Sequence, residues 1–212
     1  MQGFYSVSYY YRKVEKIMGD NFFGIEEAIK YFGVKPTSEQ LSILSKIPFP
    51  EEILRECKDT HILVAVFPLS IHEIYGKVRR QLFQFGYLHD WLHFYYLKEH
   101  GNVSWQLIRK TPVDDSFFKN WQKQQSLINK NEEIPTTRVM VYAIIGHFLA
   151  THEYLFEYVS VRTSSLASDS NHIKLGFYAP KHRSSYRNAL HVSDYGDNGF
   201  ENNLGLCVSL KS

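Results

Sequence analysis

Apolar residues in the first part of the chain recur three and four positions apart, which is the spacing of one face of an α-helix. Three segments with this spacing lie at residues 24–34, 37–47 and 48–57. The first ends at Gly33, a residue suited to a helix C-cap, and the second opens with a capping pattern that joins Thr37 to Gln40. In the third, Pro50 directly precedes two glutamates, as at a helix start. Residues 1–60 are therefore predicted to be mostly helical.

The pattern changes after residue 60, where strand-like and helix-like segments alternate before strands gather near the end. Residues 61–69 are a β-branched apolar run interrupted by Pro68, which predicts a buried strand. Further helices are expected over residues 71–98, with Gly86 as a candidate break, from a cap at Asp115/Ser116 to 128, and from Pro135 to 156. Further strands are expected over residues 102–110, 157–163, 171–177 and 204–210. This order favours an α+β fold over a doubly wound α/β fold.

Composition places the chain among ordinary globular proteins. Its 212 residues are 44% hydrophobic and 22% charged, with a formal net charge of +2. Because a nucleic-acid-binding protein usually carries a basic stripe, a nucleic-acid partner is not expected. The start lacks the apolar core of a signal peptide, and no apolar run approaches the ~20 residues of a membrane span, so we expect no membrane insertion and a cytoplasmic or virion-associated protein.

Cys57 and Cys207 lie far apart in apolar surroundings and are predicted to be packed thiols.

One segment has metal-ligand spacing. His89 and His93 are four residues apart, so on a helix they would share a face and could bind one metal ion. Asp90 stands where the zinc-protease motif requires a glutamate as general base, and the aromatic neighbours favour packed or surface histidines instead. His147 and His152, five apart, would lie on different faces of a helix. No glycine-rich phosphate loop or nucleophile elbow occurs, so we expect no enzyme and no cofactor; a metal-dependent enzyme using His89 and His93 is the alternative.

A polar segment dotted with aromatic residues precedes the last predicted strand. Residues 183–203 contain four Asn, three Ser, two Tyr, two Asp and two Gly, and no Lys. Tyr offers broad amphipathic contact with little rotamer entropy to lose, and Ser, Asn and Gly adapt their hydrogen bonding, so this composition is typical of binding surfaces. An ordinary surface loop is rich in the same residues, and composition alone favours that simpler interpretation.

The end of the chain resembles the closing segment of C-type-lectin-fold domains of the formylglycine-generating-enzyme type. The likeness is carried by HRSSYRN at residues 182–188 and DNGFENNLGLCVSL at residues 197–210, and it covers residues 105–212. Within that superfamily the segment is most similar to the variable proteins of diversity-generating retroelements, in which a C-terminal repeat is rewritten by mutagenic reverse transcription and ends in a fixed strand. The catalytic cysteine pair of the enzymes and the calcium-dependent sugar-binding triplets of animal lectins do not occur in this sequence, which argues against both activities.

The resemblance implies an α+β, C-type lectin-like domain over residues 61–212, with helices packed on a small, mainly antiparallel sheet and residues 1–60 as a mostly helical extension. Residues 177–203 would be the variable region and residues 204–210 the closing strand. The implied function is non-enzymatic binding of a variable macromolecular target, expected to be a protein; a viral or structural interaction module without variability is a further alternative. The expected ligand-binding positions are Tyr178, His182, Ser184, Ser185, Tyr186, Asn188, Ala189, His191, Ser193, Tyr195, Asp197, Asn198, Phe200 and Asn202.

Overall fold

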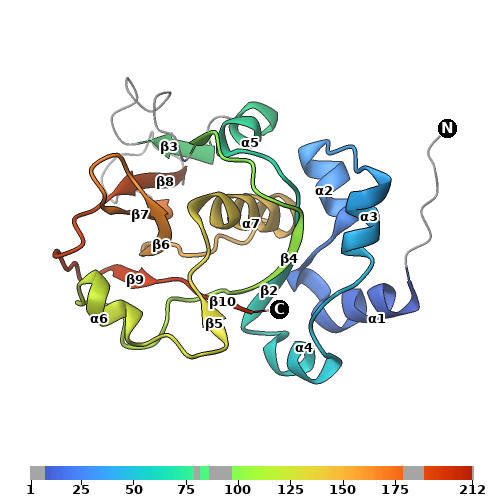
Figure 1. The fold of residues 1–212 in the computed structure, drawn as a ribbon, viewed down its shortest axis with the longest axis horizontal. Helices are drawn as coiled ribbons and strands as arrows, with labels where there is room; N and C mark the ends of the chain where they lie inside the picture. The colour runs from blue at the N-terminus through green and yellow to red at the C-terminus, as the bar shows by residue number, and fades with distance from the viewer. Residues whose placement is uncertain (1–7, 79–81, 86–96, 179–188, 212) are drawn as a thin grey trace.

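The computed structural model describes residues 8–78, 82–85, 97–178 and 189–211 (Figure 1). This part of the chain is α+β, as expected, and its helices pack with two five-stranded sheets. Both sheets are mixed, because each contains parallel as well as antiparallel strand pairs, whereas the resemblance implies one mainly antiparallel sheet. None of the helices formed by the described residues is long and apolar enough to cross a membrane.

Helices dominate the N-terminal segment, as its apolar spacing predicts. They are α1 (Tyr9–Met18), α2 (Ile25–Phe32), α3 (Ser38–Leu44) and α4 (Glu51–Cys57), with a short 3₁₀ helix η1 (Gly19–Asn21) after α1. Gly33 ends α2 in the left-handed conformation, with φ 59°. Thr37 Oγ1 accepts the backbone N–H of Gln40 at 3.2 Å, and Gln40 Oε1 accepts that of Thr37 at 3.1 Å, so the predicted capping box is confirmed. α4 begins directly after Pro50, also as predicted.

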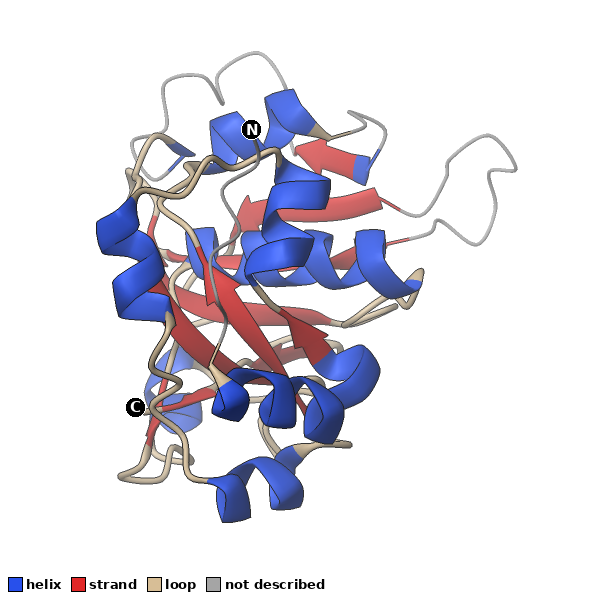
Figure 2. Cartoon of the chain, turned by 90° about the vertical axis from the view of Figure 1, so that its right-hand side faces the viewer, coloured by secondary structure: helices blue, strands red, loops and turns tan. Residues whose placement is uncertain are grey.

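Sheet A carries its strands in the order β1-β2-β4-β10-β5. These are β1 (Phe22–Phe23), β2 (His61–Val66), β4 (Ser104–Arg109), β10 (Ser209–Leu210) and β5 (Glu132–Glu133). β2 and β4 confirm the strands predicted at residues 61–69 and 102–110, and they pair antiparallel over their full lengths. Helices α1–α4 lie on the side of the molecule that faces the viewer in Figure 2. From among them α3 packs on this sheet, where the indole N–H of Trp105 donates to the carbonyl of Leu44 at 3.0 Å.

Sheet B carries its strands in the order β3-β8-β7-β6-β9. These are β3 (Phe83–Phe85), β8 (Ala189–Asp194), β7 (His172–Tyr178), β6 (Ser160–Leu166) and β9 (Leu204–Leu206). β6 and β7 confirm the strands predicted at residues 157–163 and 171–177. β8 was not predicted, because it lies in a segment whose composition is that of a loop. It forms because Leu190 and Val192 are buried on one face of the strand, opposite β7.

The segment expected as one closing strand, residues 204–210, is divided between the two sheets. β9 pairs parallel with β6 in sheet B, and β10 pairs antiparallel with β4 and β5 in sheet A. At the crossing, Cys207 donates its N–H to the carbonyl of Arg162 at 3.4 Å, and the carbonyl of Val208 accepts the N–H of Arg109 at 3.0 Å. The end of the chain therefore ties the two sheets together.

α7 (Thr137–Thr151) is the central helix and contacts strands of both sheets (Figure 1). Its start after Pro135 is as predicted. It ends at Thr151 rather than near residue 156, because His152 adopts a left-handed conformation with φ 63°. Every residue from Thr137 to His147 is buried, which is the pattern of a helix enclosed by the core on all sides.

The helix expected over residues 71–98 is correct as far as Lys77 and wrong at Val78 and at residues 83–85. α5 (Ile71–Lys77) ends where Val78 becomes extended. The next described residues form β3, which pairs parallel with β8, so a strand partner from far along the chain outweighs the local helical spacing. Residues 79–81 and 86–96 lie outside the described residues.

The helix start expected at Asp115/Ser116 is also wrong. α6 (Trp121–Gln125) begins after Asn120, whose side chain accepts the N–H of Lys123 at 3.0 Å. Asp115 has a left-handed backbone with φ 60°, whereas an N-cap residue is typically extended. Ser116 is buried, and its hydroxyl accepts the N–H of Leu206 at 3.1 Å. Its role is therefore to join this segment to β9.

Candidate binding surface

The predicted ligand-binding positions fall into three groups. His182, Ser184, Ser185, Tyr186 and Asn188 lie outside the described residues. Tyr178 ends β7, and Ala189, His191 and Ser193 lie on β8. Tyr195, Asp197, Asn198, Phe200 and Asn202 lie in the connection from β8 to β9, which we call the 195–203 loop. This loop is the part of the predicted surface that the structure describes most fully.

The positions on β8 differ in how much surface they present. Ala189 is only 6% exposed, so its side chain offers no contact area to a ligand. His191 and Ser193 are half-buried, with Nδ1 and Oγ 3.4 Å apart. Burial lowers the pKa of His191, and the nearby charge of Lys174 lowers it further, which favours the neutral imidazole.

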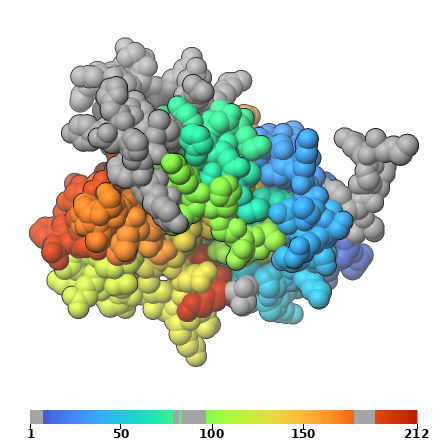
Figure 3. All heavy atoms as spheres, turned by 45° about the horizontal axis from the view of Figure 1, so that its top comes forward, coloured from blue at the N-terminus to red at the C-terminus, as the bar shows by residue number. Residues whose placement is uncertain are grey.

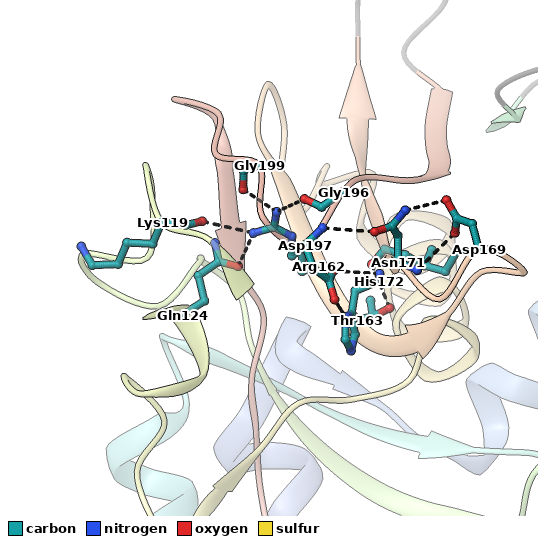
Figure 4. A network of polar contacts seen from close by, with 11 residues as sticks. Lys119, Gln124, Arg162, Thr163, Asp169, Asn171, His172, Gly196, Asp197 and Gly199 are labelled. Carbon is teal, nitrogen blue, oxygen red and sulfur yellow. Dashed lines mark hydrogen bonds and ion pairs between the residues drawn. The ribbon is translucent and has the colours of Figure 1, made fainter. Parts of the chain in front are cut away.

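Arg162, on β6, is the centre of a hydrogen-bond network that holds the 195–203 loop (Figure 4). Its side chain is fully buried. Nη1 donates to the carbonyl of Lys119 at 3.1 Å and to Oε1 of Gln124 at 2.8 Å. Nη2 donates to the carbonyls of Gly196 and Gly199 at 3.1 and 2.9 Å. One buried cation therefore fixes the backbone of the loop against the segment that leads into α6.

The charge of Arg162 is balanced by backbone and amide oxygens, since none of the described carboxylates forms an ion pair with it. Burial lowers the pKa of the guanidinium, and the charges of Asp197, Tyr195 and Glu201 partly offset this effect. The ring centroid of Tyr195 lies 5.5 Å from the guanidinium carbon, a cation–π distance. A buried cation of this kind is tolerated only while its hydrogen bonds are kept.

Asp197 was predicted as an exchangeable ligand contact, but the structure places its carboxylate against the protein. Oδ1 accepts the backbone N–H of His172 at 3.0 Å, and Oδ2 accepts the ring Nδ1–H of the same residue at 2.7 Å. The ring of His172 stacks on Trp121 with centroids 3.6 Å apart. The N–H of Trp121 donates to the carbonyl of Asp197 at 2.9 Å, which closes the contact. Asp197 therefore joins the loop to β7 and α6.

Asp197→Ala is expected to lower the free energy of unfolding by about 2 kcal/mol, because both His172 donors lose their acceptor. Asn198→Ala is the matched control: Asn198 is exposed, and its substitution should change the free energy by less than about 0.5 kcal/mol. Urea denaturation of the two variants measures both values. Equal costs at the two positions would contradict the inward role of Asp197.

Lys174, on β7, contacts two residues of the same loop, Glu201 and Tyr195. Its Nζ lies 3.0 and 3.2 Å from the two carboxylate oxygens of Glu201 and 4.4 Å from the ring centroid of Tyr195. Tyr195 thus lies near two cations, Lys174 and Arg162. A Cβ at Gly199 would lie 2.6 Å from the Tyr195 ring, so a larger residue there requires this ring to move.

Exposure alternates strictly along the loop. Tyr195, Asp197, Gly199, Glu201 and Asn203 are half-buried, whereas Gly196, Asn198, Phe200 and Asn202 are exposed. Tyr195, Asp197, Gly199 and Glu201 make the contacts described above, and the outward side chains are those of Asn198, Phe200 and Asn202. The loop therefore has a backbone held by the protein and a row of side chains directed to solvent.

Arg162 and Gln124 carry no sequence signal as site residues. Arg162 lies on a strand between two buried residues, Val161 and Thr163. Because successive side chains of a strand point to opposite faces of the sheet, the sequence predicts that Arg162 points away from the core. It is buried because the 195–203 loop covers that face. Gln124 is fully buried, and its Nε2 donates to the carbonyls of Ser116 and Leu204 at 2.8 and 3.1 Å.

A separate cleft of about 390 Å³ lies between the ends of β2 and β4 and residues 153–159. Glu153, at its edge, contacts Lys110 at 2.9 Å and accepts a hydrogen bond from Nε2 of the buried His147 at 2.9 Å. Arg109 is paired with Asp114 at 2.9 Å. The basic groups that line the cleft are thus already paired with carboxylates, and this arrangement does not favour an anionic ligand.

Stability is expected to fall as the pH decreases through 6.5, the ordinary pKa of histidine. Burial lowers the pKa of His61, His147 and His191, so the unfolded chain binds protons first and acid favours unfolding. The pKa of Glu153 is also lowered, by hydrogen bonds from His147 and Lys110 that outweigh its burial, and its contribution is lost at lower pH. The melting temperature measured from pH 7.5 to 5 should fall less steeply in His147→Gln. An unchanged slope in that variant would contradict this role of His147.

The alternative metal site at His89 and His93 lies outside the described residues. Within the described ranges, no group of three or more His, Cys, Asp or Glu side chains could hold a metal ion. His147 and His152 have separate surroundings, since the buried His147 bonds Glu153 at the cleft edge and His152 caps α7. Cys57 and Cys207 are free thiols, and burial raises the pKa of Cys207.

Comparisons with protein-family models, with curated proteins and with solved structures found no match. A function for this chain therefore has to be argued from the 195–203 loop and the residues that hold it.

Proposed function

We propose that this chain is a non-enzymatic binding protein and that the exposed side chains of residues 177–203 contact a macromolecular target. The observation that carries the proposal is the alternation of half-buried and exposed residues along the 195–203 loop. Its backbone carbonyls are bonded to Arg162, Trp121 and Phe118, while the side chains of Asn198, Phe200 and Asn202 point outward. The binding surface is thus built on a fixed backbone.

A surface of this construction suits a protein whose binding residues change. The bonds that hold the loop use backbone atoms and the inward side chains, so replacing an outward side chain leaves them intact. Surface substitutions away from such contacts usually change stability by no more than about 0.5 kcal/mol. Specificity can therefore vary while the fold stays the same, as the resemblance to retroelement-diversified proteins implies.

We further propose that the fold is C-type lectin-like, of the formylglycine-generating-enzyme subtype. Support comes from the position of residues 204–210, which follow the polar segment and are buried apart from Leu210. Through β9 these residues pair with β6, and through β10 they pair with β4, so they add a strand to each sheet directly after the 195–203 loop. A fixed ending after a variable stretch is the arrangement that the family implies.

The flanking DNA tests the proposal. We expect a near-copy of the coding sequence for residues 177–203 close by, differing mainly at adenines, beside a reverse-transcriptase gene. Codon differences should fall on outward positions such as Asn198 and Asn202 and spare Asp197. Sequences of close relatives that differ evenly along the chain, with no template repeat nearby, would contradict the retroelement part of the proposal.

A further inference from the structure

Two phenylalanine side chains protrude from neighbouring segments that are distant in sequence. Phe118, before α6, is 67% exposed, and Phe200, in the 195–203 loop, is 66% exposed. The two segments are bonded directly, because the N–H of Phe118 donates to the carbonyl of Glu201 at 3.3 Å and that of Trp121 donates to the carbonyl of Asp197 at 2.9 Å. Figures 1 and 3 show α6 and the loop side by side. The two exposed rings therefore belong to segments that are hydrogen-bonded to each other.

The backbone of Phe118 holds its ring in an unusual position. Its φ is 54°, in the left-handed region that bulky residues rarely adopt. The conformation is imposed by its surroundings, since the carbonyl of the next residue, Lys119, accepts a hydrogen bond from Arg162. The exposed ring of Phe118 contributes no burial that would offset the strain of its backbone. Backbone strain of this kind is typical of functional sites.

Residues 117–123 contain two lysines and no acidic residue. Glu201 is paired with Lys174, and the carboxylate of Asp197 is bonded to His172. Lys119 and Lys123 have no ion-pair partner among the described residues, and Asp115 is the single acidic residue in the segment from 115 to 123. A partner that covers this surface is therefore favoured if it carries carboxylates around an apolar contact.

We propose that residues 117–120 and 198–202 form one docking surface for a protein whose apolar pocket is bordered by carboxylates, with Phe118 as a fixed anchor. The inference rests on the proposed function and adds to it a contact outside the variable region. Protruding rings are buried only by a concave partner, and exposed aromatic anchors commonly dominate such interfaces. The hydrogen bonds from Arg162 hold both segments in place before binding, which favours a shaped protein pocket over a fluid lipid surface.

Disulfide-cyclised peptides from a phage-displayed random library, which can close around a protruding ring, are selected on the full chain as the test. We expect enriched peptides to place Asp or Glu beside apolar residues. Their Kd should rise at least about tenfold with Phe118→Ala and with Phe200→Ala. Tyr158→Ala is the matched control, because Tyr158 is 51% exposed and also has a left-handed backbone, with φ 62°; its Kd should change less than twofold.

The outcomes separate this inference from the proposed function. Peptides that lose affinity with Phe200→Ala and Asn198→Ala, but not with Phe118→Ala, would leave the proposed function standing. They would overturn the docking surface shared by residues 117–120 and 198–202. A selection without enriched peptides, or peptides insensitive to all three variants, would count against both. Binding to phosphatidylcholine–phosphatidylserine vesicles that depends on Phe118 would overturn the assignment of a protein partner. Because both phenylalanines are exposed, thermal unfolding of the variants should match that of the wild-type chain.

Discussion

Replacing Arg162 by methionine is expected to lower the free energy of unfolding by about 3–5 kcal/mol. Methionine fills much of the volume but donates no hydrogen bond. The amide oxygen of Gln124, which is buried, and the partly buried carbonyls of Lys119, Gly196 and Gly199 would then lose the hydrogen bonds that Arg162 donates. Urea denaturation measures the loss.

Amide hydrogen exchange shows where the loss occurs. The N–H groups of Phe118 and Trp121, which bond loop carbonyls, should exchange faster in Arg162→Met than in the wild type. Lys174→Met is the control, because its partly exposed ion pair with Glu201 is worth no more than about 1 kcal/mol. A cost for Arg162→Met no larger than that of the control would mean that the buried cation does not hold the loop.

Gly176→Ala is expected to cost about 3 kcal/mol, at the upper end of the usual penalty for overpacking. Gly176 lies on β7, and a methyl group there would overlap the carbonyl oxygen of Val159. That atom belongs to the backbone before β6, so the clash is relieved only if the strands of sheet B separate. Since Lys174 and His172 lie on the same strand, the loop should loosen as well.

The matched control is Gly196→Ala. Gly196 is exposed in the 195–203 loop, and a methyl group added there meets no atom within 4 Å. Its cost should stay below about 0.5 kcal/mol. Thermal or urea unfolding compares the pair directly. If both substitutions cost the same, the close approach of Gly176 to Val159 is not what requires glycine at that position.

Local signals account for the elements that the sequence predicts well. The capping box of Thr37 and Gln40, the glycine stop at Gly33 and the β-branched run of β2 each act within a few residues. The failures depend on distant partners. The hydroxyl of Ser116 bonds a residue 90 positions away, and residues 204–210 divide because β6 and β4 pair with different parts of them.

The same distinction applies to the binding surface. Composition identifies the polar stretch before residue 204, but it does not separate inward from outward residues. Asp197 and Asn198 are equally polar, and only the position of His172, 25 residues earlier, makes Asp197 part of the framework. Arg162 lies 37 residues before Gly199, and nothing near it in sequence indicates that the loop covers it. Phe118 lies still further from the predicted segment, so composition could not include it.

A substitution scan of residues 195–203, with folded-protein abundance as the readout, tests most directly whether this loop is a fixed backbone with exchangeable side chains. Positions 196, 198, 200 and 202 should accept most amino acids. Positions 195, 197, 199 and 201 should accept fewer. Tyr195, Asp197 and Glu201 contact Arg162, His172 and Lys174, and a side chain at position 199 would meet the ring of Tyr195. An alternating profile would support a fixed backbone, and equal tolerance at all of these positions would contradict it.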